Sequence, residues 1–206
     1  MATEAATGHG QAGGPAVHTS TGLSNVKLGM WAFLGSECLL FGALISTYIL
    51  YRGRGPDPGT LPHTHYDIPY TSVSSFVLLM SSLTMVLALA AIQRGEHERL
   101  RVWLMATALL GMTFIGGQVY EFTRFVQEGL SIKSSPAASA FFTLTGFHGA
   151  HVTVGILMLL SLYGMSLDGR LPTERSEAVE LVGLYWHFVD IVWVIIFTVV
   201  YLIPLK

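Results

Sequence analysis

The segment Glu177–Ile203 reads EAVELVGLYWHFVDIVWVIIFTVVYLI, and it decides the fold because it is apolar and long enough to cross a bilayer. A helix rises about 1.5 Å per residue, so about 20 such residues span about 30 Å of hydrocarbon. His187 and Asp190 are three residues apart, and Glu180 precedes His187 by two helical turns, so all three share one helix face. An acid at the bilayer centre costs roughly 2.5–3.5 kcal/mol on insertion scales. We therefore expect other helices to supply polar partners to this face.

The composition places the whole chain in the membrane class. Of its 206 residues 51% are hydrophobic and only 12% are charged, and the mean hydropathy is +0.55. The net charge of −2 gives no reason to expect nucleic acid as a partner. The one cysteine, Cys38, cannot form an internal disulfide, and the sequence has no zinc-binding cysteine and histidine spacing. We expect no metal site in this chain.

The hydrophobic pattern predicts an all-α membrane protein, a bundle of five transmembrane helices. The expected spans are residues 28–51, 71–93, 102–125, 139–165 and 177–203. Residues 1–26 are rich in Ala, Gly, Thr and Ser and predict a flexible tail, and residues 27–206 form the membrane domain. The histidines before the first span and in the first loop lack a complete metal-binding pattern: His9, His18, His63 and His65.

Ionisable residues near the middle of three spans predict a polar layer. Glu37, His148, His187 and Asp190 fall at similar depths, so we expect them to face one another or a partner subunit. His151 shares a helix face with His148. The His187–Asp190 pair suits a hydrogen bond that fixes helix register or a proton-handling site. For Glu37, structural hydrogen bonding and proton exchange remain equally open.

Two other patterns have structural interpretations. Gln118 and Glu121, near the end of the third span, are typical of an interhelical clamp. His148 and His151 are poor candidates for haem or copper, because two neighbouring histidines on one helix cannot both be axial haem ligands and no Glu-x-x-His pattern is present. The positive-inside rule weakly favours a cytoplasmic N-terminus and an outer C-terminus, with six of the 11 Lys and Arg residues then on the inner side.

Four motifs in order resemble those of haem-copper oxidase subunit III. They are WAFLGSECLLF (Trp31–Phe41), QVYEF (Gln118–Phe122), FFTLTGFHGAHVTVG (Phe141–Gly155) and GLYWHFVDIVW (Gly183–Trp193). Together they cover the chain from about Leu28 to Ile203. The positions that match family motifs are Glu37, His148, His151, Glu180, His187 and Asp190.

The resemblance implies an accessory subunit of a terminal oxidase that reduces dioxygen to water and pumps protons. Haem and copper then belong to subunits I and II, and this chain carries no cofactor and is not catalytic alone. The family packs directly on subunit I, binds phospholipid, and supports proton uptake and the lifetime of the active site. Small subunits of the complex are further expected partners. The five-helix form implies a bacterial plasma membrane.

The chain departs from longer family members, which have seven helices and hold lipid between the first two and the last five. Five helices cannot complete that cleft. The implied electron donor is cytochrome c, with quinol as the alternative. Two other classes remain: a stand-alone proton-coupled transporter, disfavoured because no inverted repeat is present, and a membrane b-type cytochrome.

Overall fold

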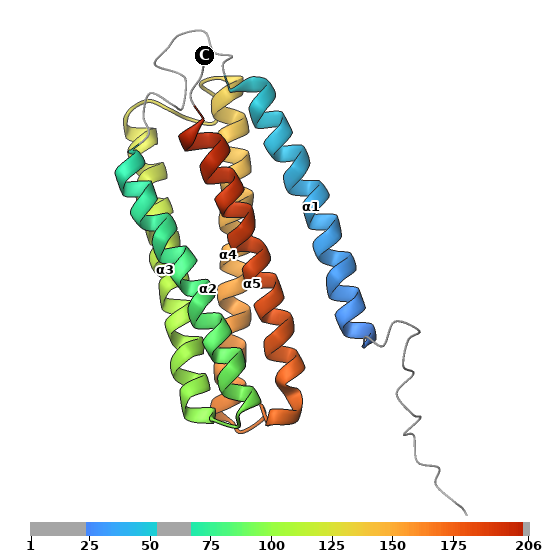
Figure 1. Cartoon of the computed structure of the whole chain (residues 1–206). Coiled ribbons are helices and arrows are strands. Elements are labelled where there is room, and N and C mark those ends of the chain that lie inside the picture. The colour runs from blue at the N-terminus through green and yellow to red at the C-terminus, as the bar shows by residue number, and fades with distance from the viewer. Residues whose placement is uncertain (1–23, 53–66, 204–206) are drawn as a thin grey trace, which may run out of the picture.

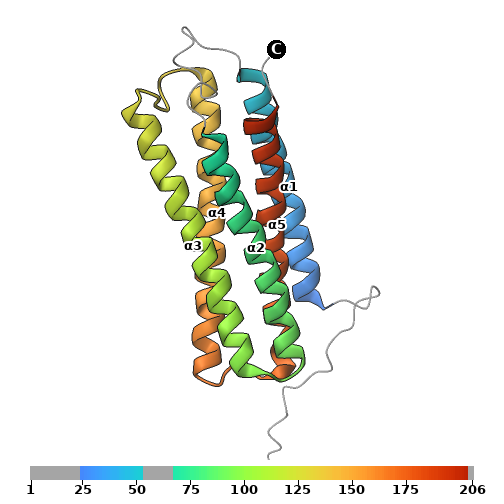
Figure 2. The same ribbon diagram turned by 60° about the vertical axis from the view of Figure 1, so that its left-hand side comes forward.

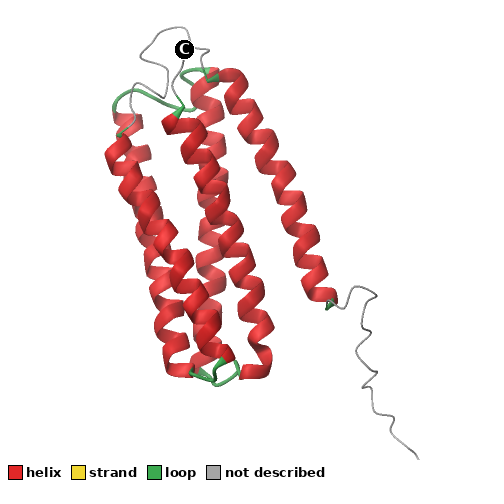
Figure 3. Ribbon diagram, in the orientation of Figure 1, coloured by secondary structure: helices red, strands yellow, loops and turns green. Residues whose placement is uncertain are grey.

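The computed structural model describes residues 24–52 and 67–203, and within those ranges the regular structure is helical (Figure 3). Five helices are long and apolar enough to cross a membrane. They are α1 (Asn25–Tyr51), α2 (Ile68–Gln93), α3 (His97–Gln127), α4 (Pro136–Leu167) and α5 (Ser176–Phe197). A 3-10 turn, η3 (Thr173–Arg175), precedes α5, and a π-helical turn, η4 (Thr198–Leu202), follows it. The predicted all-α, five-helix architecture is confirmed, whereas the predicted flexible tail before residue 24 and the loop histidines His63 and His65 lie outside the described residues.

The helices begin one to five residues earlier than the apolar pattern predicts. Helix α3, expected from Val102, begins at His97. The first helix begins at Asn25, slightly before the predicted start of the membrane domain. Three of the starts carry a side-chain cap, in which Ser24, Asp67 or Ser135 accepts a backbone N–H three residues later. Hydropathy marks the membrane-crossing part, and the caps mark the ends.

Short turns set consecutive helices antiparallel from α2 onward. At the end of α2, Gly95 has a φ of 73°, and the Glu96 N–H bonds the Ala91 carbonyl at 2.9 Å. This left-handed glycine closes the helix in a Schellman-type cap. Glycines with positive φ close α3 and α4 in the same way.

Helices α2, α3, α4 and α5 form a four-helix cluster, and α1 lies outside it against α4 and α5 (Figures 1 and 2). The buried residues of α1 are Leu34, Phe41 and Tyr48, which are seven apart. Because seven residues are close to two helical turns, they form one narrow seam. The rest of α1 is largely exposed, so this helix is the least integrated part of the bundle.

The centre of the bundle is organised around Trp186 of α5. Its ring lies between two glycines, and a Cβ added at Gly111 or Gly155 would lie 2.6 or 2.8 Å from ring carbons. The indole N–H donates to Ser81 of α2 at 2.9 Å. Glycine at both positions therefore lets α3 and α4 close on either side of a large aromatic ring.

Candidate functional site

The first polar pair joins α1 to α4. Glu37 Oε2 lies 3.1 Å from His151 Nε2, with the two side chains 15% and 17% exposed. The other ring nitrogen of His151 lies 2.8 Å from the Phe147 carbonyl. That carbonyl can only accept, so Nδ1 donates to it, and Nε2 shares a proton with Glu37. The pair can hold this proton either on the carboxyl group or on the imidazole.

The second polar group is bridged by Ser82 of α2. The Ser82 hydroxyl donates to Asp190 Oδ2, and His187 Nδ1 lies 3.2 Å from the same hydroxyl oxygen. The sequence predicted a direct pair between His187 and Asp190. The structure instead places a serine of another helix between them, because both side chains reach the Ser82 hydroxyl group of α2. We refer to His187, Ser82 and Asp190 as the serine-bridged triad.

His148 lies apart from both groups in the interior of the bundle. It is 0% exposed, and its Nε2 atom lies 3.2 Å from the Val189 carbonyl of α5. Its ring packs against Phe114 and Trp193, with centroids 5.8 and 4.8 Å away. Although His148 and His151 share one side of α4, they therefore contact different neighbours.

The polar groups thus occupy separate interhelical contacts and do not meet in one cluster. Glu37 pairs with His151 at the α1–α4 contact, whereas the serine-bridged triad lies at the α2–α5 contact. Within residues 24–52 and 67–203, no hydrogen bond or ion pair joins Glu37 to His187 or Asp190. The sequence gives depth along each helix, but the rotation of each helix decides which groups touch.

Glu121 makes the contacts expected of an interhelical clamp. This buried carboxylate accepts from Thr71 of α2 at 2.9 Å and from Tyr201 of η4 at 3.2 Å. Gln118, predicted to share this role, lies with its Oε1 atom near Gly149, and its amide nitrogen is buried with no partner in the described chain. Of these two residues, Glu121 therefore makes the hydrogen bonds between helices.

Glu180 lies near the start of α5, two turns before His187. It pairs with Lys27 at 2.5 Å, and Ser24 donates to the neighbouring Glu177. These contacts tie the start of α1 to the start of α5. Glu180 therefore belongs to the end of the bundle, about 10 Å along the helix from the triad at 1.5 Å per residue.

Serines of α2 are site residues that the sequence patterns did not predict. Trp193 donates to Ser75 at 2.8 Å, in the same way that Trp186 donates to Ser81. The sequence does hold a signal for these pairs. Trp186 and Trp193 are seven residues apart on α5, and serines recur at nearly that spacing on α2. Matching seven-residue spacings on antiparallel helices place such pairs opposite one another.

The histidines of the spans are engaged by protein oxygens. His148, His151 and His187 each have a ring nitrogen within 3.2 Å of a carbonyl, carboxylate or hydroxyl oxygen. In the part of the chain that the structure describes, no three His, Cys, Asp or Glu side chains are grouped so that they could hold a metal ion. The arrangement suits hydrogen bonding between helices and the exchange of a proton at the Glu37–His151 pair.

Comparison with known proteins matches these features to one family. Residues 9–204 match the family model of cytochrome c oxidase subunit III. The chain is 37% identical to the quinol oxidase subunit 3 of Bacillus spizizenii over 198 residues, 96% of each chain. It is 39% identical to the cytochrome c oxidase subunit 3 of Bacillus sp. PS3, over 86% of each chain. It is also 36% identical to the cytochrome bo(3) ubiquinol oxidase subunit 3 of Pseudomonas aeruginosa, over 90% of this chain and 87% of that one.

The chain belongs to the cytochrome c oxidase subunit III family. The predicted resemblance is confirmed, and the subunit III chain is one component of a multi-subunit haem-copper oxidase. Its relatives are subunits of terminal oxidases named for either donor, cytochrome c or quinol. In this subunit III chain the motif residues Glu37, His151, His187 and Asp190 all contact a neighbouring helix.

Proposed function

We propose that the chain is an accessory, non-redox subunit that packs directly on subunit I of a proton-pumping terminal oxidase. The partner subunits I and II hold the haem and copper that reduce dioxygen to water. The observation that carries this proposal is the engagement of His148, His151 and His187 by protein oxygens. Side chains held in this way stabilise the packing of a scaffold.

We propose further that the subunit supports proton uptake by subunit I and prolongs the life of its active site. The Glu37–His151 pair supports this role, because its shared proton lies between α1 and α4 and the side chains are partly accessible. A carboxyl and imidazole in contact can exchange a proton without moving the backbone.

Cytochrome c is the proposed electron donor, and quinol is the second candidate. Relatives with either name align over most of this chain at similar identity. Oxygen consumption by the purified complex with reduced cytochrome c, and separately with a quinol, tests the donor directly. Turnover with quinol alone would contradict the first assignment.

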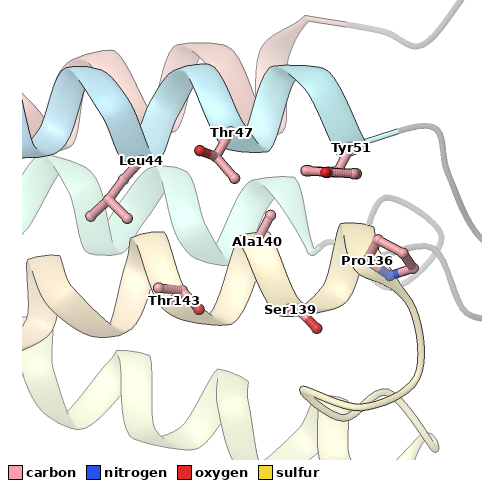
Figure 4. Close-up of a pocket in the computed structure, with 7 residues that line it drawn as sticks. All are labelled: Leu44, Thr47, Tyr51, Pro136, Ser139, Ala140 and Thr143. Carbon is pink, nitrogen blue, oxygen red and sulfur yellow. The ribbon is translucent and has the colours of Figure 1, made fainter.

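A pocket between α1 and α4 supports the proposal that the subunit binds phospholipid. It has a volume of about 270 Å³ and lies between the end of α1 and the start of α4 (Figure 4). Leu44, Thr47 and Tyr51 line it on one side, and Ala140 points toward them from α4. The Thr47 hydroxyl donates to the Ala43 carbonyl at 2.8 Å, which leaves its methyl group for contact with an apolar ligand. Such a wall suits a lipid acyl chain.

The proposed location is a bacterial plasma membrane with the N-terminus in the cytoplasm. Five spans then place the C-terminus on the outer side. The three bacterial relatives support the bacterial location. The charge difference between the two sides supports the orientation.

A mild-detergent purification through a C-terminal tag tests the accessory role. We expect a complex that consumes oxygen and shows haem bands in its reduced-minus-oxidised spectrum, and a colourless chain after the subunits are separated. Haem retained on the separated chain would make its histidines ligands, and the absence of any coloured partner would favour a stand-alone transporter.

A further inference from the structure

Within the described residues, the serine-bridged triad leaves two polar atoms without a protein partner: the buried Oδ1 atom of Asp190, and the Nε2 atom of His187 at the outer surface of the bundle. His187 is half-buried, and its Nδ1 atom contacts Ser82. In the described chain no hydrogen bond or ion pair reaches its Nε2 atom. The Nε2 atom therefore faces whatever covers the α2–α5 surface in the assembled oxidase.

The direction of the hydrogen bonds fixes the chemistry of that atom. Ser82 has a single hydroxyl proton, which it donates to Asp190 Oδ2 when the Asp190 carboxyl group is ionised. The hydroxyl oxygen must then accept from His187, so the proton of the neutral imidazole lies on Nδ1. Nε2 is left with a lone pair and requires a hydrogen-bond donor.

The depth of the triad excludes bulk water and lipid headgroups as that donor. Ser82 lies about 20 Å from the start of α2 at 1.5 Å per residue, near the middle of the helix. His187 is similarly central in the continuous helical segment of α5 and η4. Hydrocarbon at this depth offers no donor, and an unsatisfied polar group there is costly.

Large apolar side chains surround the triad on the same surface. Leu79 and Val86 of α2 lie one turn on either side of Ser82, and Ile191 and Val194 follow His187 on α5. They are 44%, 50%, 61% and 42% exposed, respectively. This surface is apolar and has one hydrogen-bond acceptor, His187 Nε2, near its centre. It therefore fits a helix whose apolar face carries one hydrogen-bond donor.

We propose that this α2–α5 surface docks a transmembrane helix of another subunit of the oxidase, which donates a hydrogen bond to His187 Nε2. The donor is a serine, threonine, tyrosine, tryptophan or amide side chain. A lipid tail would fill the surface but could not donate, and the chain's membership of a multi-subunit complex provides the helix. The inference rests on the proposed function, in which the chain packs on other subunits.

Photo-crosslinking in native membranes tests the surface. A photoreactive residue replaces Ile191 in the full chain within the assembled oxidase, and the matched control replaces Leu109, which is 53% exposed at a similar depth of α3. We expect Ile191 to crosslink to a different oxidase subunit and Leu109 not to crosslink to that subunit. Adducts from Ile191 to lipid alone, or to a second copy of this chain, would overturn the proposal.

His187→Asn tests the hydrogen bond. The asparagine amide keeps a donor near the position of Nδ1 for Ser82 but removes Nε2. We expect unchanged accumulation of the chain and an about three- to tenfold loss of its retention with the haem-containing subunits in mild detergent. The control is His97→Asn, at the start of α3, which should keep full retention.

A second variant covers the case in which His187→Asn does not fold. Ile191→Trp adds bulk at an exposed position, so it should leave the fold intact but lower retention, whereas Leu109→Trp should not. Normal retention of both Ile191→Trp and His187→Asn would overturn this proposal and leave the accessory role standing. A wild-type chain that never purifies with haem would overturn the accessory role together with this proposal.

Discussion

At the scale of single residues, the hydrogen bonds of His151 show which of its ring nitrogens donates and which one shares a proton with Glu37. Its Nδ1 atom donates to the Phe147 carbonyl, and its Nε2 atom faces Glu37 at 3.1 Å. A neutral carboxylic acid can donate to Nε2, or an imidazolium can donate to a carboxylate, and the same heavy-atom positions serve both. The proton can therefore shift between the two groups with no rearrangement of α1.

We expect Glu37→Gln to keep the subunit in place and to alter proton uptake or the lifetime of the turning-over oxidase. The glutamine amide can still donate to His151 Nε2, but it cannot release its proton. Proton uptake and activity decay of the purified complex measure this effect. Wild-type uptake and lifetime in the variant would reduce Glu37 to a packing role.

Glu37→Leu is the matched variant, because it removes the hydrogen bond as well as the proton. The part-buried Nε2 atom of His151 then loses its partner, which costs about 1–3 kcal/mol. We expect weaker attachment of α1 in addition to the effect of the glutamine variant. Equal detergent resistance of the two variants would contradict this difference.

The ring of Trp186 makes the glycines around it sensitive to the smallest enlargement. A Cβ at Gly155 would lie 2.8 Å from two ring carbons, while one at Gly164 on the same helix meets nothing within 4 Å. We expect Gly155→Ala to destabilise the bundle by about 1–3 kcal/mol and Gly164→Ala to have little effect. Unfolding of the purified chain in a denaturing-detergent titration measures both, and similar midpoints would show that the ring can move.

At the scale of elements, α1 differs from the other helices in how it is held. Its apolar contact is the seam of Leu34, Phe41 and Tyr48. Polar contacts add to the seam at mid-helix, through Glu37 and His151, and at the start, through Lys27 and Glu180. A helix held at few points can open locally while the four-helix cluster stays closed.

Phe41→Ala should loosen α1 selectively. Phe41 is 2% exposed and packs edge-on against the His151 ring at 5.0 Å. Truncation should cost less than the about 3–5 kcal/mol of a water-soluble core, because lipid can fill part of the space. We expect faster hydrogen exchange in α1 than in α3, measured by mass spectrometry. The control is Leu39→Ala, because Leu39 is 78% exposed. Equal hydrogen exchange of α1 in the two variants would show that the seam is not the main attachment of α1 to the bundle.

At the scale of the whole molecule, the odd number of spans means that the chain enters the bundle on one side of the membrane and leaves it on the other. The turn between α2 and α3 lies at one end, and the loop between α3 and α4 lies at the other (Figure 1). Residues at these two positions must therefore differ in their access from the cytoplasm.

Cysteine labelling tests the proposed orientation. In a Cys38→Ala background, Glu96→Cys should react with a membrane-impermeant maleimide only in permeabilised cells or inverted vesicles, where the reagent reaches the cytoplasmic side. Ser134→Cys, in the loop between α3 and α4, should react from the outer side of intact cells. The reverse pattern would place the N-terminus outside, and it would show that the small excess of inner positive charge does not set the topology.

The sequence by itself determined the number of membrane helices, the family and the polar residues that need partners. Apolar runs of transmembrane length have few alternatives to a helix, because the backbone must satisfy its own hydrogen bonds in hydrocarbon. Only the tertiary structure decided which polar groups meet. Glu37 pairs with His151, Ser82 separates His187 from Asp190, and His148 turns into the core. The physical reason is that a span fixes the depth of a residue, whereas its partner depends on the rotation of each helix, which packing such as that of Trp186 between two glycines sets.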